Sequence, residues 1–375
     1  MIYVDHHSTT PCDPRVLERM LPFFSERFGN SASITHSQGR NAASAVEEAR
    51  ISLARFLGAD SSEIYFTAGA TESNNIALNL LDPGQHLIVS AIEHKSILEP
   101  AKRLESAGVS VTILPVDREG FVAPDALAGA IRPNTRLASV MAANSEIGTI
   151  EPIRELASLC RERGVLFHTD ATQAAGKIAL DLGTIPCDLL SFSAHKVYGP
   201  KGIGGLFVRR GVRARPLVVG GGQERGVRSG TVNVPGVVGM AAAFDLRTSE
   251  MAEEGQRLTI LRNDLWDRLL AAIPGASVNG PRGLRLAGNL NVSFERVEAE
   301  SLIHAMRRFS LSSGSACSSG EHGPSPVLRA IGVSEALARG SIRIGLGKSN
   351  TAEQMTMLAE DLTHSVERIR RITAV

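Results

Sequence analysis

Cysteine is scarce in this sequence and shows no pairing pattern. The 375 residues include four cysteines, which stand far apart with no C-x-x-C pair: Cys12, Cys160, Cys187 and Cys317. This spacing argues against a disulfide framework and against a zinc site, so we expect no metal centre. It also favours a reducing compartment, the cytoplasm. Any cysteine with a special role must therefore be recognised from its local sequence.

Long apolar runs and an excess of charge of one sign are also lacking. Residues 1–30 show no signal-peptide pattern, and no apolar run approaches the length of a membrane span. The 40 basic and 39 acidic residues alternate along the chain and leave a formal net charge of +1. We therefore expect a cytoplasmic protein with no membrane association and no direct nucleic-acid binding.

The chain is long enough for two domains, because 375 residues with 43% hydrophobic content can bury a large core. From residue 40 to about residue 250, helical patterns alternate with short apolar strands. This alternation predicts an α/β fold with a mostly parallel sheet and helices on both faces. The expected strands are Glu63–Thr67, His86–Ser90, Val111–Leu114, Leu137–Ala142, Val165–Thr169 and Asp188–Ser193. The expected helices are Asn41–Leu57, Thr71–Leu81, Lys95–Ala107, Asp125–Ile131 and Pro152–Arg163.

The pattern changes after about residue 250, where we expect a smaller α+β domain. Its expected elements are a long charged helix, Glu250–Ala272, strands at Ala276–Asn279, Asn289–Ser293 and Ser341–Leu346, and a last helix at Ala352–Ile372. The predicted boundaries are a large domain of residues 13–250 and a small domain of residues 1–12 and 251–375.

Ligands of such sheets bind at the carboxyl ends of the strands, so we examine the loops there for chemistry. Lys196 lies in one of them, within Ser193-Ala194-His195-Lys196, between an apolar strand and a glycine-rich stretch. A lysine at this place can form a Schiff base with an aldehyde cofactor. Taken alone, Lys196 would be interpreted as a solvated surface lysine.

Polar residues also follow the preceding expected strand. An aspartate at position 170 can pair with the protonated ring nitrogen of pyridoxal phosphate. Gln173, three residues further on, can reach the phenolic oxygen of the same ring. The alternative is a helix cap, since Asp and Thr are common at strand-to-helix turns.

Two more strand ends carry candidate residues. Thr67–Asn75 passes from a strand through a small-residue turn into a helix, whose first N–H groups can bind phosphate. The alternative there is a plain turn with a capping box. His94 follows the strand His86–Ser90 and can stack on a cofactor ring and shuttle protons. Alone, His94 would be interpreted as a surface or capping histidine.

The motifs Gly-Ala-Thr-Glu-Ser, Glu-His-Lys, Asp-Ala-Thr-Gln and Ser-x-His-Lys occur in this order along the chain. Their order resembles that of the class-V aminotransferase group, which has the type-I fold of pyridoxal-phosphate enzymes. Within that group, the sequence is most similar to the cysteine desulfurases of the nitrogen-fixation and iron–sulfur-cluster type. The resemblance covers nearly the whole chain, and its other segments are Val4–Pro11, Phe28–Ser33, Gly220–Thr231, Ser312–Cys317 and Ser341–Gly347.

The resemblance implies a set of cofactor contacts in the large domain. Lys196 would hold pyridoxal 5′-phosphate covalently. Asp170 would pair with its ring nitrogen, and Gln173 would meet its phenolic oxygen. His94 would stack on the ring as a candidate acid or base. The residues implied around the phosphate are Ala70, Thr71, Ser193 and His195.

The resemblance also implies a second subunit and a substrate site. Thr231 would reach the phosphate bound to the other subunit, which implies a homodimer with shared sites. Arg343, with Asn30 nearby, would hold the carboxylate of the substrate, since a guanidinium pairs with that planar anion through two hydrogen bonds.

Cys317 separates this branch of the family from ordinary aminotransferases. Residues 312–323 around it are small and polar and show no apolar periodicity, which predicts a loop. A nucleophilic thiolate needs such exposure. Cys160 lies in an apolar helical sequence, and the three other cysteines are interpreted as core or incidental residues.

One position departs from the family pattern. The family usually has an asparagine directly before Glu-Ile-Gly, on the phenolic-oxygen side of the cofactor. Counting back from Asp170 places Ser145 there, and not Asn144. Serine is shorter, so either a water fills the gap or Gln173 carries more of the contact. The type of reaction is unaffected.

The implied reaction removes sulfur from L-cysteine, leaving L-alanine and a persulfide on Cys317, which a sulfur-acceptor protein then takes. The acceptor could be a scaffold, a carrier or a modification enzyme, in iron–sulfur cluster assembly, tRNA thiolation or DNA phosphorothioation. A selenocysteine lyase or a class-V aminotransferase of the same fold is the alternative, although an aminotransferase has no use for a thiol on a loop. A non-enzymatic sulfur-carrier scaffold leaves unexplained why Lys196, Asp170 and His94 all stand at strand ends.

Overall fold

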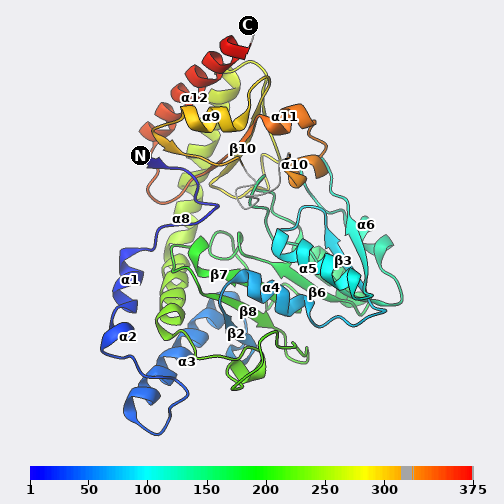
Figure 1. The fold of residues 1–375 in the computed structure, drawn as a ribbon, viewed down its shortest axis with the longest axis vertical. Helices are drawn as coiled ribbons and strands as arrows, with labels where there is room; N and C mark the ends of the chain where they lie inside the picture. Colours follow the sequence, from blue (N-terminus) through cyan, green and yellow to red (C-terminus); the bar gives the residue numbers. More distant parts are fainter. Residues whose placement is uncertain (314–322, 324, 374–375) are drawn as a thin grey trace.

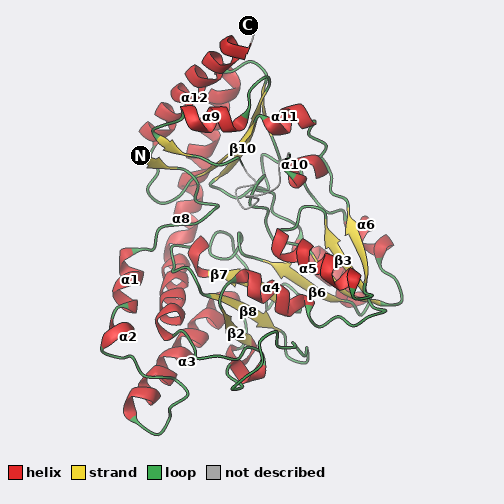
Figure 2. Ribbon diagram, in the orientation of Figure 1, coloured by secondary structure: helices red, strands yellow, loops and turns green. Residues whose placement is uncertain are grey.

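The centre of the molecule is a seven-stranded sheet with the order β2-β8-β7-β6-β5-β3-β4 (Figures 1 and 2). The structure is a computed structural model that describes residues 1–313, 323 and 325–373. The strands of this sheet are β2 (Ile64–Thr67), β3 (His86–Ser90), β4 (Ser110–Leu114), β5 (Thr135–Ser139), β6 (Leu166–Asp170), β7 (Leu189–Ser193) and β8 (Gly204–Val208). The six strands predicted for this region are all present, with ends that differ by a few residues.

Six of these strands run parallel, and β8 runs antiparallel to its neighbours β2 and β7. The sequence predicted only a glycine-rich stretch there, so β8 was missed. Only residues 194–203 separate β7 from β8, which is too short for the crossover that a parallel pair requires. The glycines of β8 have a packing reason, because a Cβ on Gly204 would lie 2.7 Å from the backbone of Gly69.

Helices cover both faces of the sheet, as the sequence predicted. The helices of this part are α1 (Pro14–Met20), α2 (Pro22–Ser25), α3 (Ser37–Leu57), α4 (Ala70–Leu78), α5 (Lys95–Ser106), α6 (Pro124–Ala130) and α7 (Ile153–Glu162). Adjacent strand residues point to opposite faces. In β7, Leu190 packs into the core that holds α3 and α7, while Leu189 packs into the core that holds α4 and α5. Both faces are therefore buried, as in other parallel sheets.

The second region is a smaller α+β unit. It contains a three-stranded antiparallel sheet of order β12-β10-β9 and the short parallel pair β1-β11. Its elements are β1 (Ile2–Tyr3), β9 (Ala276–Val278), β10 (Asn289–Phe294), α9 (Ala299–Ala305), β11 (Phe309–Ser310), α10 (Pro326–Ala330), α11 (Glu335–Arg339), β12 (Ser341–Gly345) and α12 (Ala352–Thr373). Val4 belongs to the same core as Leu265 and Ile344, so the start of the chain packs here.

Helix α8 (Val234–Ala272) joins the two regions (Figure 1). The sequence predicted a helix only from Glu250, and that start was wrong. Residues 234–249 include two glycines, a proline and mostly small apolar side chains, so they lack a helical period, yet Asn233 caps the helix through the N–H of Gly236. The division between residues 250 and 251 crosses this continuous helix, so the boundary stays a prediction.

Candidate active site

The strand ends that the sequence singled out lie along one edge of the sheet. Strands β2, β3, β6 and β7 run in the same direction, so their carboxyl ends meet at the same edge. Ala70 begins the helix after β2, His94 lies just after β3, Asp170 ends β6, and Lys196 follows β7. The parallel topology thus gathers candidates that are spread over more than a hundred residues of sequence.

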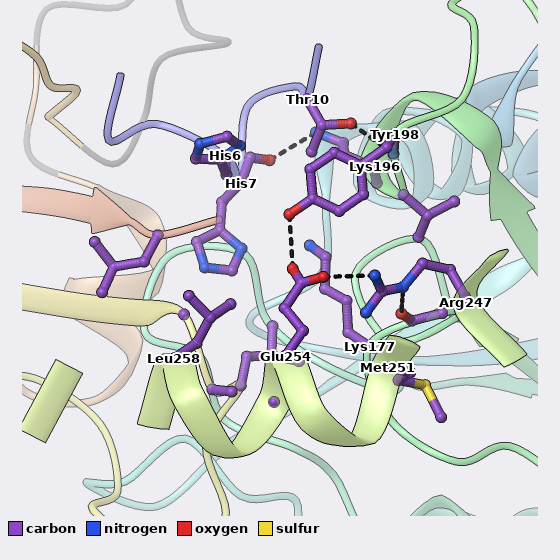
Figure 3. A pocket seen from close by; sticks show the side chains of 17 residues that line it. His6, His7, Thr10, Lys177, Lys196, Tyr198, Arg247, Met251, Glu254 and Leu258 are labelled. Atoms are coloured by element: carbon purple, nitrogen blue, oxygen red, sulfur yellow. Dashed lines mark hydrogen bonds and ion pairs between the residues drawn. The ribbon is translucent and has the colours of Figure 1, made fainter. Parts of the chain in front are cut away.

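Lys196 ends a short 3₁₀ turn and lies against the beginning of the chain. Its Nζ donates to the backbone oxygens of His7, at 2.7 Å, and Ser8, at 2.6 Å. The hydroxyl of Thr10 donates to the oxygen of His195 at 2.9 Å and accepts from the N–H of Tyr198 at 2.7 Å. Figure 3 shows these contacts, with His7 next to Lys196 and Thr10 next to Tyr198. The N-terminal segment therefore holds the amine of Lys196 through two backbone oxygens.

Asp170 is buried and its carboxylate is held by two donors. Asn74 Nδ2 donates to Oδ2 at 2.7 Å, and the N–H of Thr172 donates to Oδ1 at 2.9 Å. Only 4% of Asp170 is exposed. A carboxylate fixed in this way by N–H donors on both oxygens is well placed to pair with a cation.

A polar chain leads from Asp170 to His94. The second N–H of Asn74 Nδ2 points to Ser96 Oγ, at 2.8 Å, and Ser96 Oγ lies 2.8 Å from His94 Nδ1. The N–H of Ser96 also donates to His94 Nδ1, at 3.1 Å, so this nitrogen is an acceptor and the neutral ring carries its proton on Nε2. His94 therefore caps α5 and is also exposed. The capping role and a role beside a cofactor ring are thus compatible.

Sequence reasoning missed Asn74 and Ser96, which tie the two predicted residues together. Asn74 lies within the motif Thr67–Asn75, and Ser96 lies two residues after His94. The signal that could have identified them is their position on the buried faces of two helices, where a polar side chain needs a hydrogen-bond partner.

Gln173 contacts the N-terminal segment. Its Nε2 donates to His7 O at 2.9 Å, and its Oε1 lies 3.0 Å from His7 Nδ1 and 2.8 Å from Lys177 Nζ. Burial, with the nearby charges of Lys177 and Arg343, lowers the pKa of His7 well below its usual value. His7 is therefore neutral and donates through Nδ1. Sequence reasoning missed His7 and Lys177.

The start of α4 is the candidate anion site. Gly69 adopts φ +155°, which favours glycine, and a Cβ there would meet nothing within 4 Å. The N–H groups at Ala70 and Thr71 have no helical acceptor preceding them. Thr71 and His94 line the same pocket of about 470 Å³. Ser193 Oγ makes only a long bond of 3.4 Å to Ile203 O.

His195, a predicted phosphate residue, directly precedes Lys196. Its Nδ1 lies 3.1 Å from Thr9 Oγ1. Burial and the charges of Lys196, Lys201 and Lys177 lower the pKa of His195 to about 4. The ring is thus neutral near pH 7 and can donate one hydrogen bond.

The chemistry of these donors fits pyridoxal phosphate. The cofactor needs an amine for its aldehyde, an anion for its ring nitrogen and N–H groups for its phosphate. Lys196, Asp170 and the start of α4 supply these three groups at one edge of the sheet. Asn74 Oδ1 is buried and has no hydrogen-bond partner within residues 1–313, 323 and 325–373, so a polar acceptor remains at the site.

Arg343 lies in β12 and is buried. Its Nη2 donates to Asp5 Oδ1 at 2.8 Å, and its Nη1 donates to Ser145 O at 3.4 Å. The Asp5 contact was not predicted. Ser145 thus touches Arg343 through its backbone. The amide of Asn144 is used structurally, because it donates to Ile92 O and accepts from the N–H groups of the two residues after Ser145.

Asn30 and Thr231 are exposed and stand apart from this cluster. Asn30 lies between α2 and α3, at the opposite end of the molecule from β10, the strand that pairs with the strand of Arg343 (Figure 1). The expected proximity of Asn30 to Arg343 is therefore not found within one chain. Thr231 lies in the segment before α8.

Cys317 lies outside the described residues. The flanks of residues 314–324 can be placed, because Ser312 O accepts from the N–H of Arg343 at 2.8 Å and Ser325 Oγ donates to Glu146 Oε2 at 2.5 Å. Burial raises the pKa of Glu146, although Ser325 and Arg343 oppose the shift. Both flanks therefore lie near Arg343 and Ser145.

Neither a metal cluster nor a membrane span is found in the part of the chain that the structure describes. No group of three or more His, Cys, Asp or Glu side chains there could hold a metal ion. No helix among the described residues combines the length and the apolar character needed to cross a membrane.

Comparison with known proteins gives the class first. The family model described as aminotransferase class-V matches residues 2–358. The chain is 47% identical over 382 residues to a cysteine desulfurase named IscS from Methylococcus capsulatus, covering 99% of this chain and 94% of that protein. The chain therefore belongs to the class-V aminotransferase family and, within it, to the cysteine desulfurases. Members of this family depend on pyridoxal phosphate.

Solved structures agree with this assignment. A NifS-like protein matches with a TM-score of 0.88 at 37% identity, covering 100% of this chain and 99% of that chain. A structure described as SspA in complex with cysteine matches with a TM-score of 0.81 at 37% identity, covering 92% of this chain and 99% of that chain. The family, the fold and the enzyme class expected from the sequence are confirmed.

Proposed function

We propose that this enzyme uses pyridoxal phosphate held at Lys196 to remove sulfur from L-cysteine, and that Cys317 receives the sulfur. The observation that carries the proposal is the meeting of Lys196, Asp170 and the start of α4 at one sheet edge. The three segments supply the three kinds of group that the cofactor requires.

Each residue near the cofactor has its own part. Lys196 would hold the aldehyde of the cofactor, Asp170 would pair with its ring nitrogen, and Gln173 would donate an N–H to its phenolic oxygen. Ala70, Thr71, Ser193 and His195 would hold the phosphate, and Ser145 would lie on the phenolic-oxygen side. His94 would stack on the ring. When bound, the cofactor supplies an electron sink for the Cα carbon of the substrate.

Lys196 is the group that moves the proton of the substrate. The backbone oxygens of His7 and Ser8 accept its N–H groups and so orient Nζ. With the cofactor bound, Lys196 Nζ would accept the Cα proton of cysteine and return a proton on the product side. His94 presents Nε2–H toward the open pocket and can serve as a further proton donor.

The sulfur transfer balances without an outside oxidant. The thiolate of Cys317 attacks the sulfur of the bound cysteine, so an S–S bond forms as the C–S bond breaks. The electron pair of that bond stays on the carbon, which gains a proton and leaves as L-alanine. Cys317 keeps a persulfide. Ser312 and Ser325, which flank residues 314–324, lie near Arg343 and Ser145, and this placement supports the proposal.

Arg343 is proposed to bind the carboxylate of the substrate. Asp5 holds one side of its guanidinium, and a planar guanidinium can pair with an anion on another side. The neighbour described as SspA was solved with cysteine, which supports this substrate class.

The working form is proposed to be a homodimer. Several large apolar side chains are exposed near the α2–α3 loop and the segment before Thr231: Phe24, Phe28, Ile34, Val218 and Val219. A second copy that covered them would bury apolar area. Asn30 and Thr231 are exposed too, and Thr231 would then serve the phosphate bound to the partner.

The persulfide is proposed to pass to an acceptor protein. The reaction suits a reducing compartment, and we propose the cytoplasm, with no membrane association and no direct nucleic-acid binding. The sulfur is proposed to serve iron–sulfur cluster assembly, tRNA thiolation or DNA phosphorothioation. Selenocysteine lyase activity is the alternative for the same site.

The test measures the visible absorbance of the loaded protein and the products that it forms from cysteine. The purified protein loaded with pyridoxal phosphate is expected to be yellow and to convert cysteine to alanine with no keto-acid acceptor. Lys196→Ala should lose both properties. A protein that forms alanine only with an added keto acid would be an aminotransferase, and a Lys196→Ala variant with full turnover would overturn the assignment.

A further inference from the structure

A small cavity adjoins Lys196. It has a volume of about 40 Å³ and is enclosed by the N-terminal segment, the turn at Gly176 and α8 (Figure 3). Lys196 and Lys177 both line it. On the α8 side, Glu254 accepts from Tyr198 Oη at 2.7 Å and from Arg247 Nη1 at 2.5 Å. Glu254 thus accepts hydrogen bonds from Tyr198 and Arg247, whereas Lys177 donates to a different residue.

That partner is the amide of Gln173. Lys177 Nζ donates to Gln173 Oε1 at 2.8 Å. Burial, followed by the charge of Lys196, lowers the pKa of Lys177 to about 7. An ammonium and a neutral amine both carry N–H groups, so the hydrogen bond survives in either state.

The network leaves the Gln173 amide only one orientation. Its other end faces His7 O, an acceptor, so that end must be the NH₂ group. The same carbonyl accepts from Lys196 Nζ, which places the Gln173 NH₂ group and the lysine amine around one oxygen. One N–H of Gln173 bonds His7 O, and the second is available to an acceptor in the site.

We propose that Lys177 is a positioning residue for the cofactor, because its bond to Gln173 Oε1 turns the free N–H of that amide toward the phenolic oxygen. The proposal rests on the proposed function, which places the phenolic oxygen beside Gln173. Without Lys177, Gln173 Oε1 keeps the His7 Nδ1 contact but loses its second donor, so the amide is held less firmly and presents its N–H to the phenolic oxygen less often.

The first experiment is a pH titration of the visible absorption band of the loaded protein. Lys177→Met keeps an unbranched side chain that is one atom shorter and removes the donor. The phenolic oxygen then loses an N–H and holds the proton that it shares with Lys196 Nζ more tightly. The apparent pKa of the band should rise by about one unit, a tenfold change in proton affinity. Cofactor affinity of the stripped protein should fall about tenfold.

Lys201→Met is the matched control. Lys201 is exposed and lies five residues after Lys196, so the variant removes a nearby positive charge without touching Gln173. Its band should titrate as in the wild type. An equal rise in Lys201→Met and Lys177→Met would show that charge alone moves the band and would overturn the proposal.

A double-mutant cycle separates positioning from direct charge. Gln173→Leu should raise the apparent pKa by itself, and Lys177→Met should then add nothing, because its effect passes through the amide. Additive shifts would overturn the proposal, as would an unshifted Lys177→Met single variant.

Gln173→Glu tests the same contact without altering Lys177, should Lys177→Met fail to fold. The carboxylate can accept from Lys177 but has no N–H for the phenolic oxygen, so the apparent pKa should rise at least as far. An unchanged pKa would overturn the role of the amide. A wild-type protein that shows no visible band with pyridoxal phosphate would instead overturn the proposed function, and the role of Lys177 with it.

Discussion

Asn74 shows at the scale of one residue how the site is held together. Its NH₂ group divides its two N–H bonds between the carboxylate of Asp170 and the hydroxyl of Ser96, and Ser96 in turn contacts His94. A single amide therefore connects the group proposed for the ring nitrogen to the group proposed to stack on the ring.

Removing this amide should loosen the site. In Asn74→Ala, Asp170 loses a buried donor, which costs about 1–3 kcal/mol. We expect cofactor affinity and kcat to fall at least tenfold, measured by equilibrium binding and by alanine formation. Asn75→Ala is the matched control, because among the described residues the Asn75 side chain bonds to Thr71 O of its own helix and to no other group. Equal losses in both variants would contradict the role of Asn74.

Cys317 should divide the chemistry into two halves. With Cys317→Ser, the loaded protein should keep its colour and respond spectrally to cysteine, because the cofactor site is intact. Persulfide and sulfide formation should fall to background, measured by trapping with an alkylating reagent. Cys160→Ser serves as the control, since Cys160 is buried in α7. Normal sulfur release by Cys317→Ser would require another nucleophile.

At the scale of elements, α4 and β8 meet through two glycines. Gly204→Ala would place a Cβ 2.7 Å from Gly69 and push the start of α4 away from β8. We expect weaker cofactor binding and a lower Tm. Gly129→Ala is the control, because a Cβ there meets nothing within 4 Å and its helix gains up to about 1 kcal/mol from alanine. Unchanged cofactor affinity in Gly204→Ala would show that this contact does not shape the anion site.

The turn between β3 and α5 contains a buried carboxyl group, Glu93, whose effect on folding stability depends on pH. Burial raises the pKa of Glu93 to about 8, against hydrogen bonds from Ser90 and Met141 N–H. Between pH 4.5 and 8 the folded form keeps a proton that the unfolded form has lost, so stability falls as pH rises through this window.

The expected result is a Tm difference that grows with pH. Glu93→Gln cannot ionise, so its Tm relative to wild type should rise from pH 5 to pH 9, by an amount that reflects a shift of several pKa units. Differential scanning calorimetry at both pH values measures it. Glu99→Gln, on the exposed side of α5, should show no such trend. A constant difference for Glu93→Gln would mean that Glu93 is ionised in the folded state throughout.

At the scale of the whole molecule, one chain leaves Asn30 and Thr231 outside the cluster around Lys196. A homodimer in which Thr231 serves the partner explains their exposure. Lys196→Ala and Thr231→Asp should each be inactive, the second because it sets a negative charge against a phosphate. In a hybrid of the two, one of the two sites has both residues intact.

Refolding the two inactive variants together should therefore restore about a quarter of wild-type activity, since about half of the dimers are hybrids with one working site. Each variant refolded alone should stay inactive. Alanine formation and sedimentation measure the outcome together. An active monomer, or no recovery in proven hybrids, would contradict the shared site.

The sequence alone determined the strand-and-helix alternation, and with it the sheet edge where the chemistry lies. Short apolar segments and capping turns are local signals, and parallel strands bring their carboxyl ends together whatever their order. That is why Lys196, Asp170 and His94 could be named before any coordinates. The family motifs added Arg343 and Cys317.

Only the tertiary structure decided how these residues are supported. Strand β8 was not predicted, because its glycines are required by close packing against Gly69 and give no strand pattern. The first half of α8 was not predicted, because its residues are apolar without a helical period. Asn74 and His7 act through partners 22 to 166 residues away in sequence, such as Ser96 for Asn74 and Gln173 for His7. A hydrogen bond over such a separation leaves no local pattern, because it exists only once the strands have been ordered into the sheet and the N-terminal segment has packed across Lys196.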